Sequence, residues 1–186
     1  MIYFNCDYLE GGHPKILERM METNMEQLTG YSTDHYCDSA REKIRRACGR
    51  EDADVHFLVG GTQTNLIAIA SVLKPYQGVL AAHDGHIACH ETGAIEATGH
   101  KVLPVPCVDG KITGDEVSQY CSAHATDTIR EHTVQPGLVS ISFPTATGSR
   151  STTAAPTHTT PPYSKTRRRS AAFHATPRTT ATAWRS

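Results

Sequence analysis

The feature that most limits the fold of this chain is an abrupt change of composition at Ala146. The 41 residues from Ala146 to Ser186 contain no Asp, Glu, Val, Ile, Leu or Met, and Thr, Ala, Arg, Ser and Pro fill 34 of these positions. A segment without large aliphatic side chains buries too little apolar surface to offset the conformational entropy that folding costs. We therefore expect residues 1–145 to form a partial domain and residues 146–186 to be a disordered, low-complexity tail.

The two segments also carry opposite net charges. All 19 acidic residues lie before Ala146, whereas the tail contains only basic charges, so the formal net charge of -1 averages an acidic and a basic segment. One interpretation of the tail is a basic arm that binds nucleic acid or a membrane surface. The interpretation that we favour is out-of-frame reading of a GC-rich gene, because such reading yields Ala, Arg, Pro, Ser and Thr in excess. We therefore expect neither a nucleic-acid nor a membrane partner.

The rest of the composition predicts a cytoplasmic protein with reduced thiols. No apolar run reaches the roughly 18 residues of a membrane span, and the N-terminus lacks the charged-then-apolar pattern of a signal peptide. The 6 cysteines show no C-x-x-C pair and no regular spacing, which argues against a disulfide framework or a zinc knot.

Strand-like and helix-like segments alternate along the first 145 residues. After an extended stretch at 2–9, one helix opens at His13-Pro14, and a second follows Ser32 or Thr33 and ends at Gly49. Apolar runs then predict strands at 55–59, 78–81, 102–106 and 138–143, and helical periodicity predicts helices at 65–73 and 91–97. The stretch 112–117 is expected to be a strand that enters a helix. This alternation predicts an α/β fold with a mainly parallel sheet and flanking helices. We expect the sheet to be incomplete, since its last strand runs into the change of composition.

The first candidate site is the sequence GGTQTN at Gly60, between a predicted strand and a predicted helix. Glycines after a strand let the backbone approach a ligand, and a helix N-terminus offers free N–H groups that suit a phosphate. Thr62 or Thr64 can add a hydroxyl donor. The sequence is neither G-x-G-x-x-G nor a Walker loop, which disfavours a dinucleotide or a nucleoside triphosphate. A tight turn with a Thr cap is the alternative.

The second candidate site follows the next strand and is rich in histidine. An imidazole at the carboxyl end of a parallel strand can stack on a planar cofactor. His86 and His90, four residues apart, could instead hold a metal on one helical face, but only His83 offers itself as a third ligand, so we expect no metal here. The alternative for each histidine is a capping or partly exposed residue.

Together these sites resemble the threonine aldolase and β-eliminating lyase family of pyridoxal-phosphate (PLP) enzymes. The resemblance runs from about Phe4 to Thr145 and rests on five sequences: FNCDYLEGGHP at Phe4, GYSTDHYC at Gly30, GGTQTN at Gly60, GHIACHETGAIE at Gly85 and VQPGLVSISFPT ending at Thr145. It implies the first half of a fold type I large domain, PLP as cofactor, a small amino-acid substrate and a homo-oligomeric intact enzyme.

The resemblance also assigns roles to individual residues. Gly61 and Thr62 would hold the cofactor phosphate, with Gln63 nearby, and His86 would stack on the pyridine ring. His86 or, more weakly, His90 is the nearest candidate for the base that takes the substrate hydroxyl proton. Three further residues would lie near the substrate or a subunit interface: Asp7, Tyr31 and Asp34.

The departures from the family decide what we expect of this chain. Family members place Ser-Asp where this chain has Cys6-Asp7, and their Schiff-base Lys, their pyridine-binding Asp and their substrate-binding Arg come from the second half. The only Lys after Lys111 is Lys165, which lies in the tail. We therefore expect a truncated and inactive relative of enzymes that cleave threonine to glycine and acetaldehyde. A β-eliminating lyase, or a non-catalytic remnant that binds a phosphorylated ligand or a partner subunit, are the alternatives.

Overall fold

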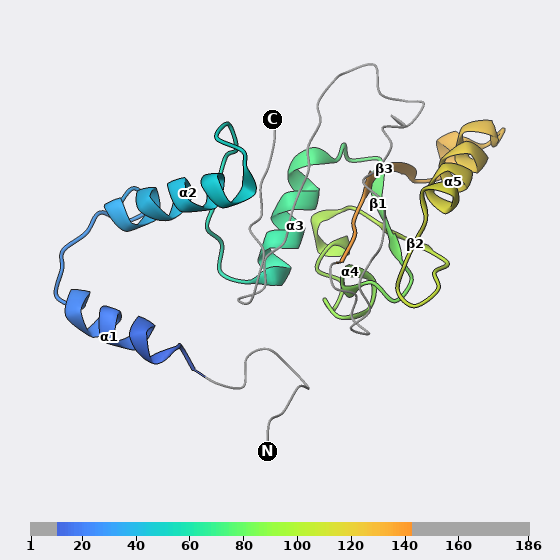
Figure 1. The fold of residues 1–186 in the computed structure, drawn as a ribbon. Helices are drawn as coiled ribbons and strands as arrows, with labels where there is room; N and C mark the ends of the chain where they lie inside the picture. Colours follow the sequence, from blue (N-terminus) through green and yellow to red (C-terminus); the bar gives the residue numbers. More distant parts are fainter. Residues whose placement is uncertain (1–10, 143–186) are drawn as a thin grey trace. The chain divides into compact units, whose positions relative to one another are not determined.

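The computed structural model describes residues 11–142, which fall into two units, residues 11–57 and 58–142 (Figure 1). The first unit contains α1 (Pro14–Thr23) and α2 (His35–Cys48). The second unit alternates helices and strands in this order: α3 (Gly61–Val72), β1 (Gln77–Ala82), α4 (His86–Cys89), η1 (Glu96–Thr98), β2 (Val102–Val105), α5 (Gly114–Thr126), η2 (Arg130–His132) and β3 (Gln135–Val139). The expected extended stretch at 2–9, the candidate Asp7 and the tail at 146–186 lie outside the described residues.

The sheet of the second unit is parallel, as the alternation of elements predicts. Its strand order is β2-β1-β3, with Val79 opposite Val102 on one side and Leu138 on the other. Strand β2 contains Pro104 and lies at an edge, where the missing proline N–H removes no ladder hydrogen bond. The fold class expected from the sequence is thus confirmed for this unit.

The central strand β1 is apolar along its length because both of its faces are covered. Val79 and Ala81 pack on one face with Ile69 of α3 and with Leu73, the residue that follows this helix. The alternate side chains of β1 pack on the other face with β2 and α5, in a cluster made of Leu80, Ala82, Leu103, Val105, Ile112 and Cys121. Helices α3 and α5 accordingly lie on opposite sides of the sheet (Figure 1). Buried parallel strands show this continuous apolar pattern instead of alternation.

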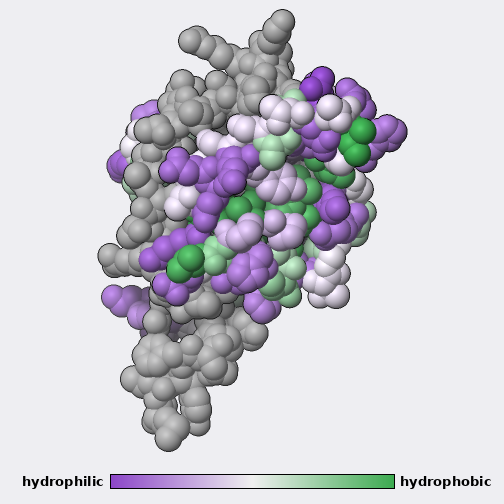
Figure 2. All heavy atoms as spheres, turned by 90° about the vertical axis from the view of Figure 1, so that its right-hand side faces the viewer, coloured by the Kyte–Doolittle hydropathy of each residue, from purple (hydrophilic) through white to green (hydrophobic). Residues whose placement is uncertain are grey.

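The surface of the molecule is a mixture of hydrophilic and hydrophobic side chains. Figure 2, which views the right-hand side of Figure 1, shows hydrophobic atoms reaching the surface between hydrophilic ones. Large apolar side chains are exposed at Val108, Ile129 and Ile141. No helix within residues 11–142 has both the length and the hydropathy that crossing a membrane requires.

Four predicted elements differ in the structure. The strand predicted at 138–143 is β3, which begins three residues earlier and ends at Val139. Residues 55–58 form no strand, and Val59 is exposed; an apolar run becomes a strand only when another strand hydrogen-bonds to it. The predicted helix at 91–97 is wrong, because the backbone turns into the left-handed region at Thr92 and Gly93 and leaves only short helices on either side. At 112–117 the predicted helix is present and the predicted strand is not, because Thr113 and Glu116 form a capping box that starts α5 at Gly114.

Helix α2 begins at a carboxylate cap that the sequence analysis assigned to a different role. The Asp34 side chain accepts a hydrogen bond from the backbone N–H of Cys37 at 2.9 Å, so Asp34, and neither Ser32 nor Thr33, is the N-cap. Hydrogen bonding by Cys37, from its thiol first and then from its backbone N–H, lowers the pKa of the Asp34 carboxyl below its ordinary value. The helix ends at Gly49 in the left-handed conformation, as predicted.

The lowered pKa of Asp34 predicts a pH-dependent helix. A carboxylate whose pKa is lower in the folded state stabilises that state above its unfolded pKa, and this stabilisation is lost as the pH falls through the folded pKa. The far-UV circular dichroism of α2 should therefore weaken in acid. Asp34→Asn should keep the cap and lose this part of the pH dependence, while Asp34→Ala should lose helix already at neutral pH. Identical acid titrations for the wild type and Asp34→Asn would contradict this.

Candidate functional site

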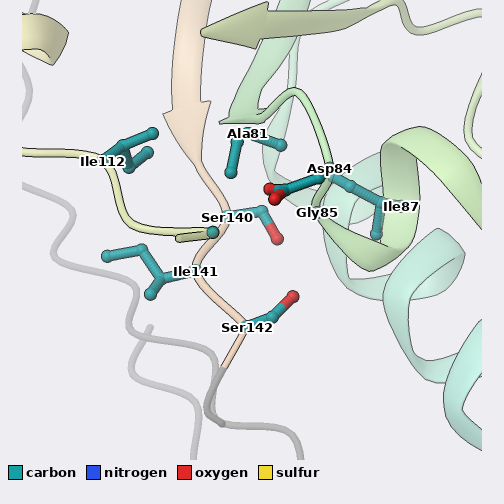
Figure 3. Close-up of a pocket in the computed structure, with 10 residues that line it drawn as sticks. Ala81, Asp84, Gly85, Ile87, Ile112, Ser140, Ile141 and Ser142 are labelled. Carbon is teal, nitrogen blue, oxygen red and sulfur yellow. The ribbon is translucent and has the colours of Figure 1, made fainter. Parts of the chain in front are cut away.

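The carboxyl ends of β1 and β3 border a pocket at the edge of the sheet. In Figure 3 the side chains of Asp84, Ser140 and Ser142 extend toward the space between the end of β3 and α4. Asp84 belongs to the turn after β1, and Ser140 is held to β1 by a bond from its N–H to the carbonyl of Leu80 at 2.8 Å. Ligands of parallel α/β sheets bind at this edge. The pocket therefore lies where the histidine-rich motif predicts a site, and Asp84 and Gly85 of that motif line it.

Helix α3 presents an uncapped N-terminus. It begins at Gly61, four residues earlier than predicted, so that Thr62 and Gln63 lie in its first turn. The preceding Gly60 has a φ of 130°, a conformation that glycine adopts and other residues rarely do. No side chain of residues 11–142 caps the helix, and the first N–H groups of a helix have no partner within it. These groups and the exposed Thr62 hydroxyl form a site suited to a phosphate.

The side chain of Gln63 has a local role in the structure. Its Oε1 accepts a hydrogen bond from the backbone N–H of Val59 at 2.9 Å, which ties the loop before α3 to the first turn of the helix. Thr64 acts in the same place, because its hydroxyl donates to the carbonyl of Gly60 at 2.8 Å. Of the side chains predicted near the phosphate, Thr62 is therefore the one that no local hydrogen bond explains.

A buried carboxylate joins the two motifs. The side chain of Glu91 is 0% exposed, and its Oε1 accepts hydrogen bonds from Asn65 Nδ2 at 2.6 Å and from His86 Nδ1 at 2.8 Å. When Glu91 is ionised it can only accept, so this contact then requires the proton of His86 on Nδ1 and leaves Nε2 for other partners. Glu91 thus orients the half-exposed imidazole of His86 and also contacts Asn65 near the start of α3.

The sequence analysis did not identify Asn65 or Glu91 as site residues. Glu91 lay in a stretch predicted to be helical, where an acidic residue is ordinarily exposed. The usable signal was its place five residues after His86 in a histidine-rich turn. The second carboxylate oxygen, Glu91 Oε2, is buried and has no hydrogen-bond partner among residues 11–142. Leaving such an atom unpaired is costly, so this position suits a polar group brought by a ligand or by further chain.

The other predicted site residues within 11–142 are His90, Tyr31 and Asp34. His90 ends α4, and its ring centroid lies 5.8 Å from that of His86, with the two rings tilted by 55°. Tyr31 is fully exposed with a φ of 59°, and Asp34 caps α2; both belong to the first unit. Their proposed place at a subunit interface stays a prediction.

Comparison with known proteins decides the family. Residues 4–153 match the model of the family described as β-eliminating lyase. The chain belongs to this family. It is 26% identical over 148 residues to a low specificity L-threonine aldolase of Pseudomonas sp., covering 78% of this chain and 41% of that one. It is 29% identical over 112 residues to the enzyme of the same name from Pseudomonas aeruginosa, covering 59% and 32% respectively.

A solved structure agrees with the family and the fold. The structure of Leishmania major threonine aldolase superposes with a TM-score of 0.72 at 48% sequence identity, over 77% of this chain and 41% of that chain. The three-stranded parallel sheet with its flanking helices corresponds to part of a fold type I large domain. The chain spans less than half the length of each of these relatives.

Proposed function

We propose that this chain carries the phosphate-binding and ring-binding part of a PLP-dependent aldolase that cleaves β-hydroxy-α-amino acids, with threonine giving glycine and acetaldehyde. The observation that carries the proposal is the buried Glu91, which fixes His86 beside the uncapped N-terminus of α3. The names of the two curated relatives and of the solved structure favour aldol cleavage over β-elimination.

The residues present fit two parts of the cofactor. The N–H groups at Gly61 and Thr62 would bind the phosphate, and the face of His86 would cover the pyridine ring. Bound PLP supplies an electron sink for cleavage next to the amino acid Cα. Because Glu91 holds Nδ1, His86 would offer Nε2 as the atom that takes the proton of the substrate hydroxyl, with His90 as the weaker candidate.

Binding of pyridoxine phosphate tests this proposal without catalysis. This compound carries the ring and the phosphate of PLP and has no aldehyde to react with surface lysines. Thr62→Val removes a hydroxyl donor and should weaken its binding by about 0.5–1.5 kcal/mol, with no effect on unphosphorylated pyridoxine. His86→Ala should weaken both compounds, because it removes a contact to the ring. Isothermal titration calorimetry measures each affinity.

The control is Thr126→Val, which removes a hydroxyl from α5, a helix on the other face of the sheet. This variant should bind both compounds as the wild type does. Equal affinity of wild type and Thr62→Val for the phosphate compound would leave GGTQTN as a tight turn. Equal affinity of His86→Ala for both compounds would remove the ring-binding role of His86.

A further inference from the structure

Three side chains with different donor atoms converge beside the pocket, on loops that the aldolase proposal does not use. His83 and Asp84 follow β1, and Cys107 follows β2. The Sγ atom of Cys107 lies 3.1 Å from His83 Nδ1 and 2.9 Å from Asp84 Oδ1. One ligand atom from each of the three residues lies within 4.8 Å of the other two.

These distances are close to those of a tetrahedral metal site. With metal–ligand bonds of the lengths that zinc makes to sulfur, nitrogen and oxygen, neighbouring ligand atoms are roughly 3.3–3.8 Å apart. The sulfur contacts of Cys107 are therefore a few tenths of an ångström short of this spacing, and a small rotation of the three side chains would open room for an ion. The Cys107 thiol donates a hydrogen bond to Asp84 Oδ1, and zinc would take the place of this thiol proton.

Backbone hydrogen bonds hold His83 and Asp84 in position. The N–H of His83 donates to the carbonyl of Val105 at 2.9 Å, which joins the ends of the two strands. The turn at His83 and Asp84 closes through the N–H of Gly85 and the carbonyl of Ala82, and a Cβ at Gly85 would lie 2.9 Å from that oxygen. A tight turn of this kind fixes where both side chains start, so the cluster does not depend on a free loop.

We propose that His83, Asp84 and Cys107 bind a zinc ion that clamps the carboxyl ends of β1 and β2. A set of one sulfur, one nitrogen and one oxygen donor suits Zn²⁺, whereas Mg²⁺ and Ca²⁺ take oxygen ligands. Three protein ligands leave a fourth position for water or a small ligand. The sequence analysis considered His86 and His90 as metal ligands and expected no metal; the structure brings together a different set, in which His83 alone is shared. The clamp would also stiffen the turn that leads to His86.

Cobalt(II) tests the site, because a thiolate ligand gives this ion an intense near-ultraviolet charge-transfer band that nitrogen and oxygen ligands do not. The reduced, chelator-treated 186-residue chain should bind one Co²⁺ with this band, and Zn²⁺ should displace it. Cys107→Ser should lose the band and bind more than about 10-fold more weakly. Cys48→Ser, which changes an exposed cysteine of the first unit, should keep both.

Two further variants identify the other ligands. His83→Gln and Asp84→Asn should each keep the charge-transfer band, since the thiolate remains, and weaken Co²⁺ binding by more than about 10-fold. Far-UV circular dichroism of each variant checks that the sheet is intact, and because His83 is exposed its replacement is the mildest. A band that survives Cys107→Ser, a band lost in Cys48→Ser, affinity unchanged in His83→Gln, or no saturable band in the wild type would each overturn the site.

Discussion

Incubated with PLP and L-threonine or L-allo-threonine, the purified chain should release acetaldehyde no faster than free PLP does. Covalent chemistry on PLP uses a positioned lysine and an anion beside the pyridine nitrogen. No acidic residue follows Glu131, and Lys165 is the only Lys after Lys111. The loss of such groups typically costs orders of magnitude in rate, so we propose that the 186-residue chain has no aldolase activity of its own.

The assay needs a positive control and a chemical one. A full-length threonine aldolase under the same conditions shows that the coupled detection of acetaldehyde works, and PLP with an unrelated lysine-rich protein gives the background. The remaining lysines that could contribute are Lys15, Lys43, Lys74, Lys101 and Lys111. Turnover clearly above background that disappears when one of these is replaced by alanine would falsify the prediction of inactivity.

Truncating the centre of the sheet is the second change with a large expected effect. Leu80 is 1% exposed and packs in the cluster between the sheet and α5. Leu80→Ala removes buried carbon atoms and leaves a cavity, which typically costs about 2–5 kcal/mol. The described part of β3 has a neighbour on one side only, and we expect the chain to be poorly stable. A loss of this size should therefore unfold the second unit at 25 °C.

Leu17→Ala is the matched control, because it makes the same chemical change at a side chain that is 50% exposed in α1. Its urea-unfolding curve, followed by far-UV circular dichroism, should overlay that of the wild type, whereas Leu80→Ala should show no folded baseline. Leu80→Ala could instead show a cooperative transition whose free energy of unfolding is within about 1 kcal/mol of the wild-type value, which is roughly the accuracy of such extrapolations. This result would mean that Leu80 is not part of the stabilising core.

The sequence was sufficient to predict the elements that depend on local patterns. The apolar run at 78–81 became β1, and the capping and C-terminal signals placed the second helix within a few residues of α2. The prediction of a strand at 55–59 was wrong because a strand needs a hydrogen-bonded neighbour, which no local pattern reveals. The prediction of a helix at 91–97 was wrong because Thr92 adopts a positive φ, which threonine rarely does.

The candidate site likewise contains some features that the sequence predicts and others that it does not. GGTQTN and the histidine-rich segment could be singled out as candidates because each follows a predicted strand, where ligands of parallel sheets bind, and the separate roles of Thr62 and His86 came from the family resemblance. The bond from Asn65 to Glu91 joins residues 26 positions apart, and the contact of His83 with Cys107 joins residues 24 apart. Such pairs follow from the packing of α3 and β2 around β1, which the sequence pattern does not specify.

The strand order β2-β1-β3 has a consequence for synthesis on the ribosome. The central strand β1 is made first, β2 then covers one of its sides, and its other side waits for β3, which begins only at Gln135. During this interval the row of unpaired N–H and C=O groups along β1 can hydrogen-bond to any extended segment nearby. Because a chain grows at about 5–20 residues per second, the nascent protein exposes that edge for seconds. The time during which this edge of β1 can mispair is therefore set by the length of chain between β1 and β3.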